Sequence, residues 1–393
     1  MPTKSNGDLR RLGTILAVGA VVGFGARYVL ELANRNAARA PLRLIDWRQA
    51  KAIALAISQT DQAPVDDQAA REAQYARLVA RSEPLIAGYM GVSLPESAAA
   101  RLRVADRREW LLANFESFER LFAPVEATYL RASRRRGGTH TLLTDVNSRL
   151  LGAQMGALLG FLARRVLGQY DLSLLSPDPE QRGTLYFVEP NIARVQTQLG
   201  LSDEDFRLWI ALHEVTHVFQ FEAFPWVRAY FNDLLSQFLG QLTDQLSGLG
   251  AGLAQLLGRI LRGEQSDKSW IEQMLTPEQQ RIFDRMQALM SIVEGYSNHV
   301  MNAIGGQLLP SFAQIEQRIE QRRQSRTLLE ELFNRLTGLN LKLAQYQQGE
   351  QFINAVVGAR GLAFANRIWE RPESLPTLEE IRDPQRWIAR MDV

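Results

Sequence analysis

Apolar residues recur at spacings of three and four along most of the 393-residue chain, which is the pattern of helices that bury one face. Residues 141–171 carry this spacing with only small glycines as interruptions, so they predict one long helix. Residues 182–191, RGTLYFVEPN, form a short apolar and aromatic run bounded by Gly183 and Pro190, which predicts a strand near 184–188. The pattern indicates a mainly α protein, a large helical domain with a short β element.

Capping residues indicate where the next two helices begin. Asn191 can cap a helix that reaches Gly200. Ser202 is followed three residues later by an acidic residue, a pattern of the capping-box type. It predicts a helix that extends to about Glu222, with Pro225 stopping it.

The second half of the chain has similar signals. Thr276, a proline directly after it and Gln279 predict the start of a helix that should run to the glycine pair near position 305. Residues 229–262, rich in Leu, Phe, Gln and Gly, predict one or two amphipathic helices. They would form a hairpin on the core, or else a mobile lid or membrane-touching surface. The tail 371–387 contains three prolines and should form short turns and helices.

The charge balance gives no reason to expect a nucleic-acid partner. Lys and Arg number 45 and Asp and Glu 43, so the two signs nearly cancel. Arginines cluster at 131–138 and 315–326, but no aromatic residues interleave with them as a base-stacking surface would require. Both clusters are interpreted as solvated turn or helix surfaces.

The amino-terminal segment 1–43 is first hydrophobic and then basic. A run of uncharged residues separates Arg11 from Arg27, and a run of about twenty that includes Arg27 would span a bilayer if the arginine snorkels. Residues 12–32 are therefore a candidate membrane anchor, with a buried or surface-lying amphipathic helix as the alternative. Basic residues follow, so an anchored chain would keep residues 44–393, one helical domain, on the cytoplasmic side.

Two of the chain's four histidines, His213 and His217, stand four residues apart with Glu214 directly after the first. On a helix both imidazoles face one side and can reach a single metal ion. Glu214 is rotated by about 100° from His213, which removes it from the ligand position but lets it reach a water on the metal. This is the H-E-x-x-H arrangement, in which two histidines bind Zn²⁺ and the glutamate is the general base.

The third ligand must be a nitrogen or oxygen donor, because the chain has no cysteine. Glu294 is preferred, since an unpaired carboxylate would be unfavourable inside its otherwise apolar helix. His299, on another face of that helix, is the alternative. Asn298, four residues after Glu294, is placed to orient a histidine ligand by a hydrogen bond. His140 follows three arginines in a Gly-rich turn and is expected at the surface.

With these residues in view, the chain resembles the gluzincin arrangement of zinc metallopeptidases. It resembles more closely a bacterial family of zincin-like hydrolases, one branch of which is associated with deazaflavin cofactor biosynthesis. The segments that carry the resemblance are GAQMGALLGFLARRVLGQYD, LYFVEPNI, EDFRLWIALHEVTHVFQFEAFPWVR, EGYSNHVMNAIG and LNLKLAQYQQGEQF. It covers roughly 44–393 and implies a mainly helical fold with zincin-like active-site helices. It also implies zinc at His213, His217 and Glu294, with Glu214 catalytic, but no particular substrate.

Together these observations predict a zinc-dependent hydrolase, with metallopeptidase as the favoured class and a peptide or other amide as substrate. Tyr296, Tyr346 and His299 are candidates for stabilising the oxyanion. One alternative is a zinc-stabilised helical binding or scaffold protein without turnover. Another is a membrane-attached interaction module. Glu214 argues against the scaffold, because a purely structural zinc site needs its ligands but not this carboxylate.

Overall fold

The computed structural model describes residues 43–58, 67–135, 142–171, 182–245, 275–324 and 339–392. Up to strand β3, the elements are α2 (Trp47–Ser58), α3 (Gln68–Met90), the 3₁₀ helix η1 (Ala98–Arg101), β1 (Leu102–Ala105), α4 (Arg107–Arg135), α5 (Leu142–Ala163), β2 (Gly168–Asp171) and β3 (Thr184–Val188). The helices that follow are α6 (Glu189–Leu199), α7 (Asp203–Glu222), α8 (Pro225–Gln245), α11 (Pro277–Leu308), α12 (Phe312–Gln324), α14 (Leu339–Arg360), α15 (Leu362–Ala365), η2 (Asn366–Trp369), η3 (Pro372–Ser374), α16 (Leu378–Arg382) and α17 (Pro384–Met391).

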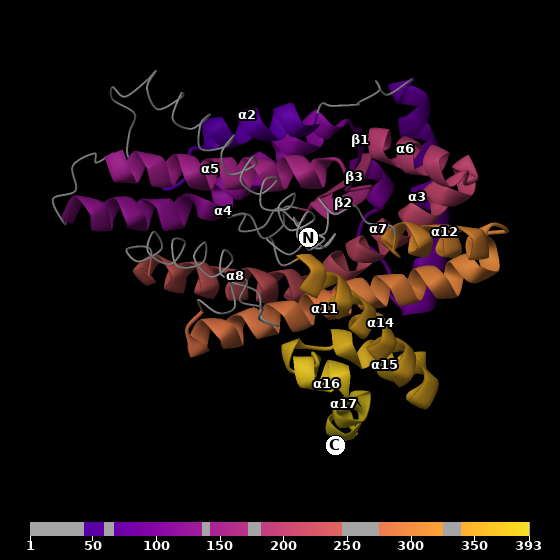
Figure 1. The fold of residues 1–393 in the computed structure, drawn as a ribbon. Coiled ribbons are helices and arrows are strands. Elements are labelled where there is room, and N and C mark those ends of the chain that lie inside the picture. Colours follow the sequence, from indigo (N-terminus) through magenta and orange to yellow (C-terminus); the bar gives the residue numbers. More distant parts are fainter. Residues whose placement is uncertain are drawn as a thin grey trace, which may run out of the picture.

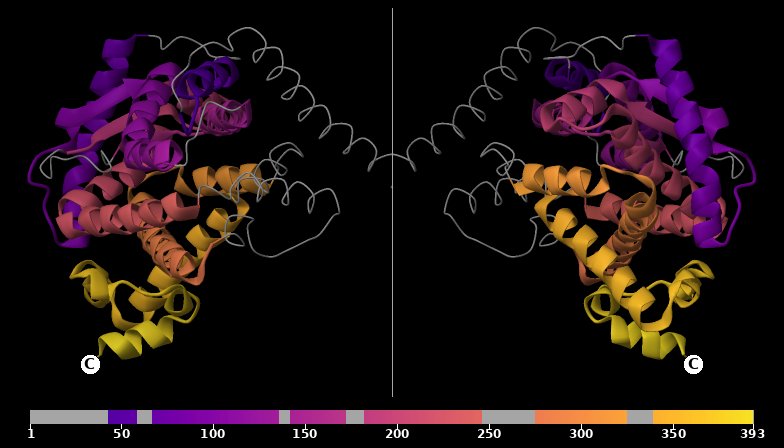
Figure 2. Two further views of the ribbon diagram at one scale, coloured as in Figure 1. Left: turned by 90° about the vertical axis from the view of Figure 1, so that its left-hand side faces the viewer. Right: turned by 90° about the vertical axis from the view of Figure 1, so that its right-hand side faces the viewer.

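The helices form two groups that meet at a small sheet (Figure 1). Helices α2, α4 and α5 lie side by side and enclose one hydrophobic cluster, which includes Trp47, Trp110 and Phe115. Helices α3, α7, α11 and α14 surround the larger cluster. The short helices α15 to α17 lie beyond α11 and α14, on the side away from α2 (Figure 2). The prediction of a mainly α protein with a short β element is confirmed.

The sheet has the strand order β1-β3-β2. The predicted strand, β3, is its central member, and β1 runs parallel to it with Leu102 opposite Leu185. Strand β2 runs antiparallel to β3, with Gly168 opposite Phe187. The two outer strands have four residues each, too short to show an alternating pattern, and the sequence did not predict them.

Residues 141–171 do not form the single helix that their pattern predicts. Helix α5 ends at Ala163, and Gly168–Asp171 form β2. The buried side-chain amide of Asn191 donates to the carbonyls of Ala163 and Val166, both at 2.7 Å. The first contact satisfies a carbonyl that the end of the helix leaves open, and the second holds the turn that follows it. Asn191 therefore closes one helix, whereas the sequence suggested that it opens another.

Helix α6 begins directly after β3, earlier than predicted, and reaches Leu199. Its N-cap is Val188, which makes no side-chain cap, and Pro190 lies in the first turn. Proline is tolerated there because the first amides of a helix have no intrahelical acceptor. Gly200 closes the helix in the left-handed conformation, with φ of 58°.

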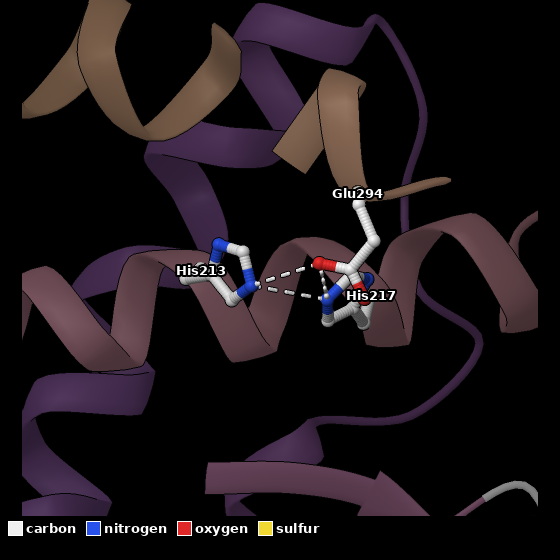
Figure 3. Close-up of side chains that lie close together, drawn as sticks. All are labelled: His213, His217 and Glu294. Atoms are coloured by element: carbon white, nitrogen blue, oxygen red, sulfur yellow. Dashed lines mark hydrogen bonds and ion pairs between the residues drawn. The ribbon is translucent and has the colours of Figure 1, made fainter. Parts of the chain in front are cut away.

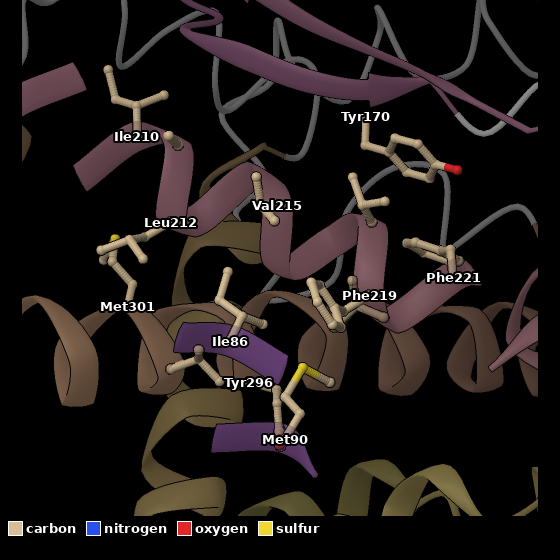
Figure 4. Packing of buried hydrophobic residues seen from close by; sticks show 14 of the residues in the cluster. Ile86, Met90, Tyr170, Ile210, Leu212, Val215, Phe219, Phe221, Tyr296 and Met301 are labelled. Atoms are coloured by element: carbon tan, nitrogen blue, oxygen red, sulfur yellow. The ribbon is translucent and has the colours of Figure 1, made fainter. Parts of the chain in front are cut away.

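Helix α7, which carries the H-E-x-x-H motif, has the predicted boundaries. The Ser202 side chain accepts from the amide of Asp205, and the helix runs from Asp203 to Glu222. Pro225 does not only follow this helix, as predicted, but is also the first residue of α8. Apolar residues of α7 project toward the elements on both sides of it (Figure 4), so most of the helix is buried. Trp209 and His213, one turn apart, are half-buried.

Helix α11 starts at the predicted capping box. The Thr276 side chain accepts from the amide of Gln279, and the Gln279 side chain accepts from the amide of Thr276. The helix continues through the glycine pair that was expected to end it and stops at Leu308. The ring of Phe312 packs against Gly305, where a larger side chain would collide with it.

The tail forms the short helices that its prolines predict, and these are anchored to the core. The buried indole of Trp387 donates to the carbonyl of Ser374 at 2.8 Å. Its ring meets Phe352 and Phe364 edge-on, at 5.6 Å between centroids in both cases. The tail therefore stabilises α14 rather than only covering the surface.

Within the described ranges, none of the helices is long and apolar enough to cross a membrane. Residues 12–32 lie outside those ranges, so the membrane anchor stays a prediction. The second half of the predicted helical region 229–262 is also outside them, because α8 is described only as far as Gln245.

Two glycines let α11 and α14 approach closely beside the motif. A Cβ at Gly349 would lie 1.9 Å from the Ser291 carbonyl oxygen, and one at Gly295 would lie 2.3 Å from the carbonyl carbon of Gly349. We expect Gly349→Ala to lower the free energy of unfolding by at least ~2 kcal/mol, because the helices must separate.

Gly358→Ala is the matched control. Gly358 lies on the same helix, and a Cβ added there would have no other atom within 4 Å, so alanine should be neutral or stabilise by up to ~1 kcal/mol. Chemical denaturation of both variants measures the difference. Equal stability of the two would show that the helix crossing does not require Gly349.

Candidate metal centre

The structure brings three of the predicted residues together from two helices (Figure 3). His213 and His217 project from consecutive turns of α7, and Glu294 projects toward them from α11. The Nε2 atoms of the two histidines are 3.2 Å apart. Glu294 Oε2 lies 3.6 Å from His213 Nε2 and 3.8 Å from His217 Nε2. Two helices that are distant in sequence thus aim three donor atoms at one point.

These separations fit a zinc ion. Ligand atoms at ~2.0–2.1 Å from Zn²⁺ in tetrahedral geometry are about 3.3 Å from one another. The distance between the histidine nitrogens is 3.2 Å, and the carboxylate oxygen would need to move by only a few tenths of an ångström. Two imidazoles and one carboxylate leave the fourth position for water or substrate, as in catalytic sites.

Local electrostatics hold these side chains in the protonation states that bind metals. Burial lowers the pKa of His217, although the charge of Glu294 opposes the shift. Burial alone would raise the pKa of Glu294, but the neighbouring His217 and His213 lower it below its ordinary value. Metal ions bind the neutral form of an imidazole and the ionised form of a carboxylate.

The side chains of His213 and Glu294 are 22% and 25% exposed and that of His217 is 10% exposed, so solvent reaches the cluster from one side.

Glu214 lies beside the cluster but outside it. It is buried on α7, and burial raises its pKa to about 7, helped by the charge of Glu294 and opposed by that of His213. Its carboxyl group lies against the backbone of Gly168, where an added Cβ would be 2.7 Å from Oε1. Within the part of the chain that the structure describes, the carboxylate has no hydrogen-bond or ion-pair partner.

The histidine-orienting role predicted for Asn298 falls to other residues. Nδ1 of His217 lies 2.9 Å from Gln220 Oε1 and 3.1 Å from Ser297 Oγ. Asn298 instead lines a cavity of about 370 Å³ between α7, α11, α12 and α14. Asn298 therefore does not orient His217, because that ring already has an acceptor on its own helix, three residues further on.

The remaining described candidates, His299 and Tyr296, have hydrogen-bond partners outside the three donor residues. His299 is paired on both sides, with the Tyr89 hydroxyl at 2.8 Å from Nε2 and Asn354 Oδ1 at 2.6 Å from Nδ1. Its pKa is lowered by burial, against the effect of Asn354. The buried hydroxyl of Tyr296 donates to Asn366 Oδ1 at 2.6 Å. Both ring nitrogens of His299 and the hydroxyl of Tyr296 are therefore already hydrogen-bonded within the protein, and these are the groups that would bind a metal or stabilise an oxyanion.

Two further candidates cannot be placed. Tyr346 lies on α14, but its side chain is outside the described part of the structure. His140 lies in the gap between the described residues of α4 and α5.

Sequence reasoning missed Gln220, Ser297 and Gly168. Gln220 had a readable signal, since it stands three residues after His217 and therefore on the same side of the helix. Ser297 and Gly168 had none, because their contacts depend on how α11 and β2 pack against α7.

The comparisons with known proteins agree with this geometry. Residues 45–388 match the family described as zincin-like metallopeptidase, and the chain belongs to it. A solved protein of Chloroflexus aurantiacus, which carries a provisional hydrolase assignment and a fold described as novel, is 57% identical. The match covers 89% of this chain and 99% of that one, with a TM-score of 0.66. No curated protein matches the chain.

Family and geometry together imply a metal site. The zincin-like family implies a bound metal, and His213, His217 and Glu294 form a group that could hold the ion. The family and the solved relative also support a hydrolase in general terms.

We expect Gly168→Ala to disturb Glu214 and leave the three donor atoms in place. The added methyl would lie 2.6 Å from Glu214 Cγ, so the carboxyl group must shift. Metal content should be unchanged, while any hydrolytic rate should fall, because an error of about 1 Å in a catalytic group can cost ~10²-fold. Metal analysis and activity of the same preparation measure both quantities. Loss of metal with retained activity per bound ion would contradict this account.

Proposed function

We propose that the protein is a zinc-dependent hydrolase that cleaves peptide or related amide bonds, with Glu214 as general base. The observation that carries the proposal is the position of Glu214. It is a buried carboxylate with a pKa of about 7, next to three donor side chains and without a structural partner among the described residues. A general base works best when its pKa lies near the working pH.

His213, His217 and Glu294 would hold the ion, which when bound supplies Lewis-acid polarisation of a carbonyl and a water of lowered pKa. Glu214 would accept a proton from the attacking water and later deliver it to the leaving nitrogen. The close contact between Glu214 and the backbone of Gly168 restricts where the carboxyl group of Glu214 can move. The apolar residues around α7 exclude other water from the buried side of the cluster.

A cavity between α7, α11, α12 and α14 supports the proposal by offering space for part of a substrate. Its volume of about 370 Å³ lies in the range of ligand pockets. Trp209 and Asn298 belong to its wall, and they stand one helical turn from His213 and from Glu294 respectively. A substrate bound there would have to reach from these two residues to the donor atoms, which are not part of the cavity wall.

The non-catalytic scaffold remains the competing proposal. A zinc ion that only stabilises the fold would require the three donors, but it would not require a fourth buried carboxyl group beside them. Burying Glu214 without a partner costs stability, and a catalytic role would explain why that cost is tolerated.

The wild-type protein should contain about one zinc ion per chain after purification with zinc, because the three donors converge on one position. Glu294→Gln and His213→Ala should lose it. His299→Ala is the matched control, since His299 lies on the same helix as Glu294 but contacts Tyr89 and Asn354. Metal analysis by mass spectrometry measures the ratio. Full zinc content in Glu294→Gln would remove Glu294 from the ligand set.

Glu214→Gln separates the enzyme from the scaffold. Glutamine keeps the volume but cannot accept a proton near neutral pH, so hydrolysis of a peptide library should fall by ~10²–10⁴-fold. Zinc content and thermal stability should stay close to those of the wild type, since Glu214 is not a ligand. Equal cleavage by both proteins would refute Glu214 as the base. Absence of cleavage by a zinc-loaded wild type across a broad library would favour the scaffold.

A further inference from the structure

Gln220 joins the two helices that supply the donor atoms. It is fully buried on α7, one turn after His217. Its Nε2 donates to the carbonyl oxygen of Val293 at 2.8 Å, and its Oε1 lies 2.9 Å from His217 Nδ1. Val293 immediately precedes Glu294 on α11. A single side chain therefore contacts one ligand directly and the backbone beside another.

The Val293 contact fixes which way the amide of Gln220 points. A carbonyl oxygen can only accept, so the NH₂ group of Gln220 must face Val293. The oxygen Oε1 then faces His217, and it too can only accept. Nδ1 of His217 must therefore carry the hydrogen, and Nε2 keeps the lone pair. Nε2 is the atom directed toward His213 and Glu294.

Ser297 supports the same tautomer. Its buried hydroxyl is 3.1 Å from the Val293 carbonyl, 3.3 Å from Gln220 Oε1 and 3.1 Å from His217 Nδ1. The single hydroxyl hydrogen has two acceptors available, Val293 and Gln220. The oxygen can then offer a lone pair to the N–H of His217, which makes a second acceptor for the same hydrogen.

We propose that Gln220, assisted by Ser297, is a positioning residue that fixes the tautomer and ring orientation of His217 and couples them to the turn of α11 that carries Glu294. The proposal rests on the proposed function, because it assumes that His217 Nε2 binds the metal. It assigns to a neutral glutamine the role that a carboxylate or a backbone carbonyl often has beside a metal-bound histidine. The α7–α11 distance and the His217 orientation are thereby set by one hydrogen-bonded chain.

The first test measures zinc affinity by competition with a chelator. Gln220→Leu removes both contacts and should weaken zinc binding by ~10–100-fold. Gln220→Glu keeps the acceptor for His217 but loses the donor to Val293, so it should bind zinc at least ~10-fold more tightly than Gln220→Leu. If the two variants bind zinc equally weakly, zinc affinity depends on the hydrogen bond to Val293 and not on the orientation of His217. That result would overturn the proposal.

Thr216→Val is the matched control. Thr216 is equally buried on the same helix, and its hydroxyl donates at 2.7 Å to the Leu212 carbonyl. Valine removes one buried hydrogen bond next to His217 without touching its ring. Zinc affinity should stay within about twofold of the wild type. A loss as large as that of Gln220→Leu would overturn the proposal, because general loosening of α7 would then explain both.

The second test determines the tautomer of His217 by NMR in the metal-free protein. With four histidines in the chain, ¹⁵N-histidine labelling gives few enough signals to assign, using His217→Ala as reference. Wild type and Gln220→Glu should show His217 protonated at Nδ1, and the double variant Gln220→Leu with Ser297→Ala, which removes both acceptors, should show a mixture or protonation at Nε2. Nδ1 protonation that persists in the double variant would overturn the proposal.

The two tests also separate this proposal from the proposed function. A wild type that binds no zinc would defeat the metal site and, with it, the role of Gln220 in metal binding. A wild type that binds zinc but cleaves nothing would leave the positioning role intact and defeat only the hydrolase. Normal folding of the variants is checked by their unfolding transitions in the presence of chelator.

Discussion

The burial of α7 over most of its surface is the constraint on which the rest of the structure depends. A polar group inside such a helix costs stability unless it finds a partner. Arg207 meets this condition through Glu189 and Asp203, and the Thr216 hydroxyl does so through the carbonyl of Leu212. Gln220 does so through Val293 and His217. Each of these polar side chains has a structural explanation.

Three further polar side chains in the middle of α7, His213, Glu214 and His217, lie at the candidate metal centre. The Nε2 atoms of His213 and His217 approach each other and Glu294, and the carboxyl group of Glu214 lies beside them. A metal ion would satisfy the first three donors at once, and Glu214 would retain a chemical rather than a structural role. Along this helix the fold thus gives up stability beside the candidate metal centre, which is typical of functional sites.

Local signals in the sequence predicted the site well where one helix was enough. The spacing of His213 and His217, the cap at Ser202 and the capping box at Thr276 are properties of single turns, and the structure contains all three. Glu294 could be singled out because a lone carboxylate in an apolar helix needs a reason to be there. These features require no knowledge of the neighbouring elements.

Features that depend on contacts between elements could not be predicted. Asn191 has the residue type of a helix cap, but its amide closes α5 through Ala163, and this contact joins residues 28 positions apart. Asn298 has the right spacing from Glu294 to orient a histidine, yet Gln220 is the residue that contacts Nδ1 of His217. In both cases a polar residue was identified as important, and its partner was set by packing that no periodicity encodes.

Crystallography at the zinc absorption edge tests the central claim most directly. A crystal of the zinc-loaded protein should give one anomalous peak within ~2.0–2.2 Å of His213 Nε2, His217 Nε2 and a carboxylate oxygen of Glu294, with Glu214 outside bonding distance and a fourth position open. A peak coordinated by other residues, or by Glu214 in place of Glu294, would contradict the account.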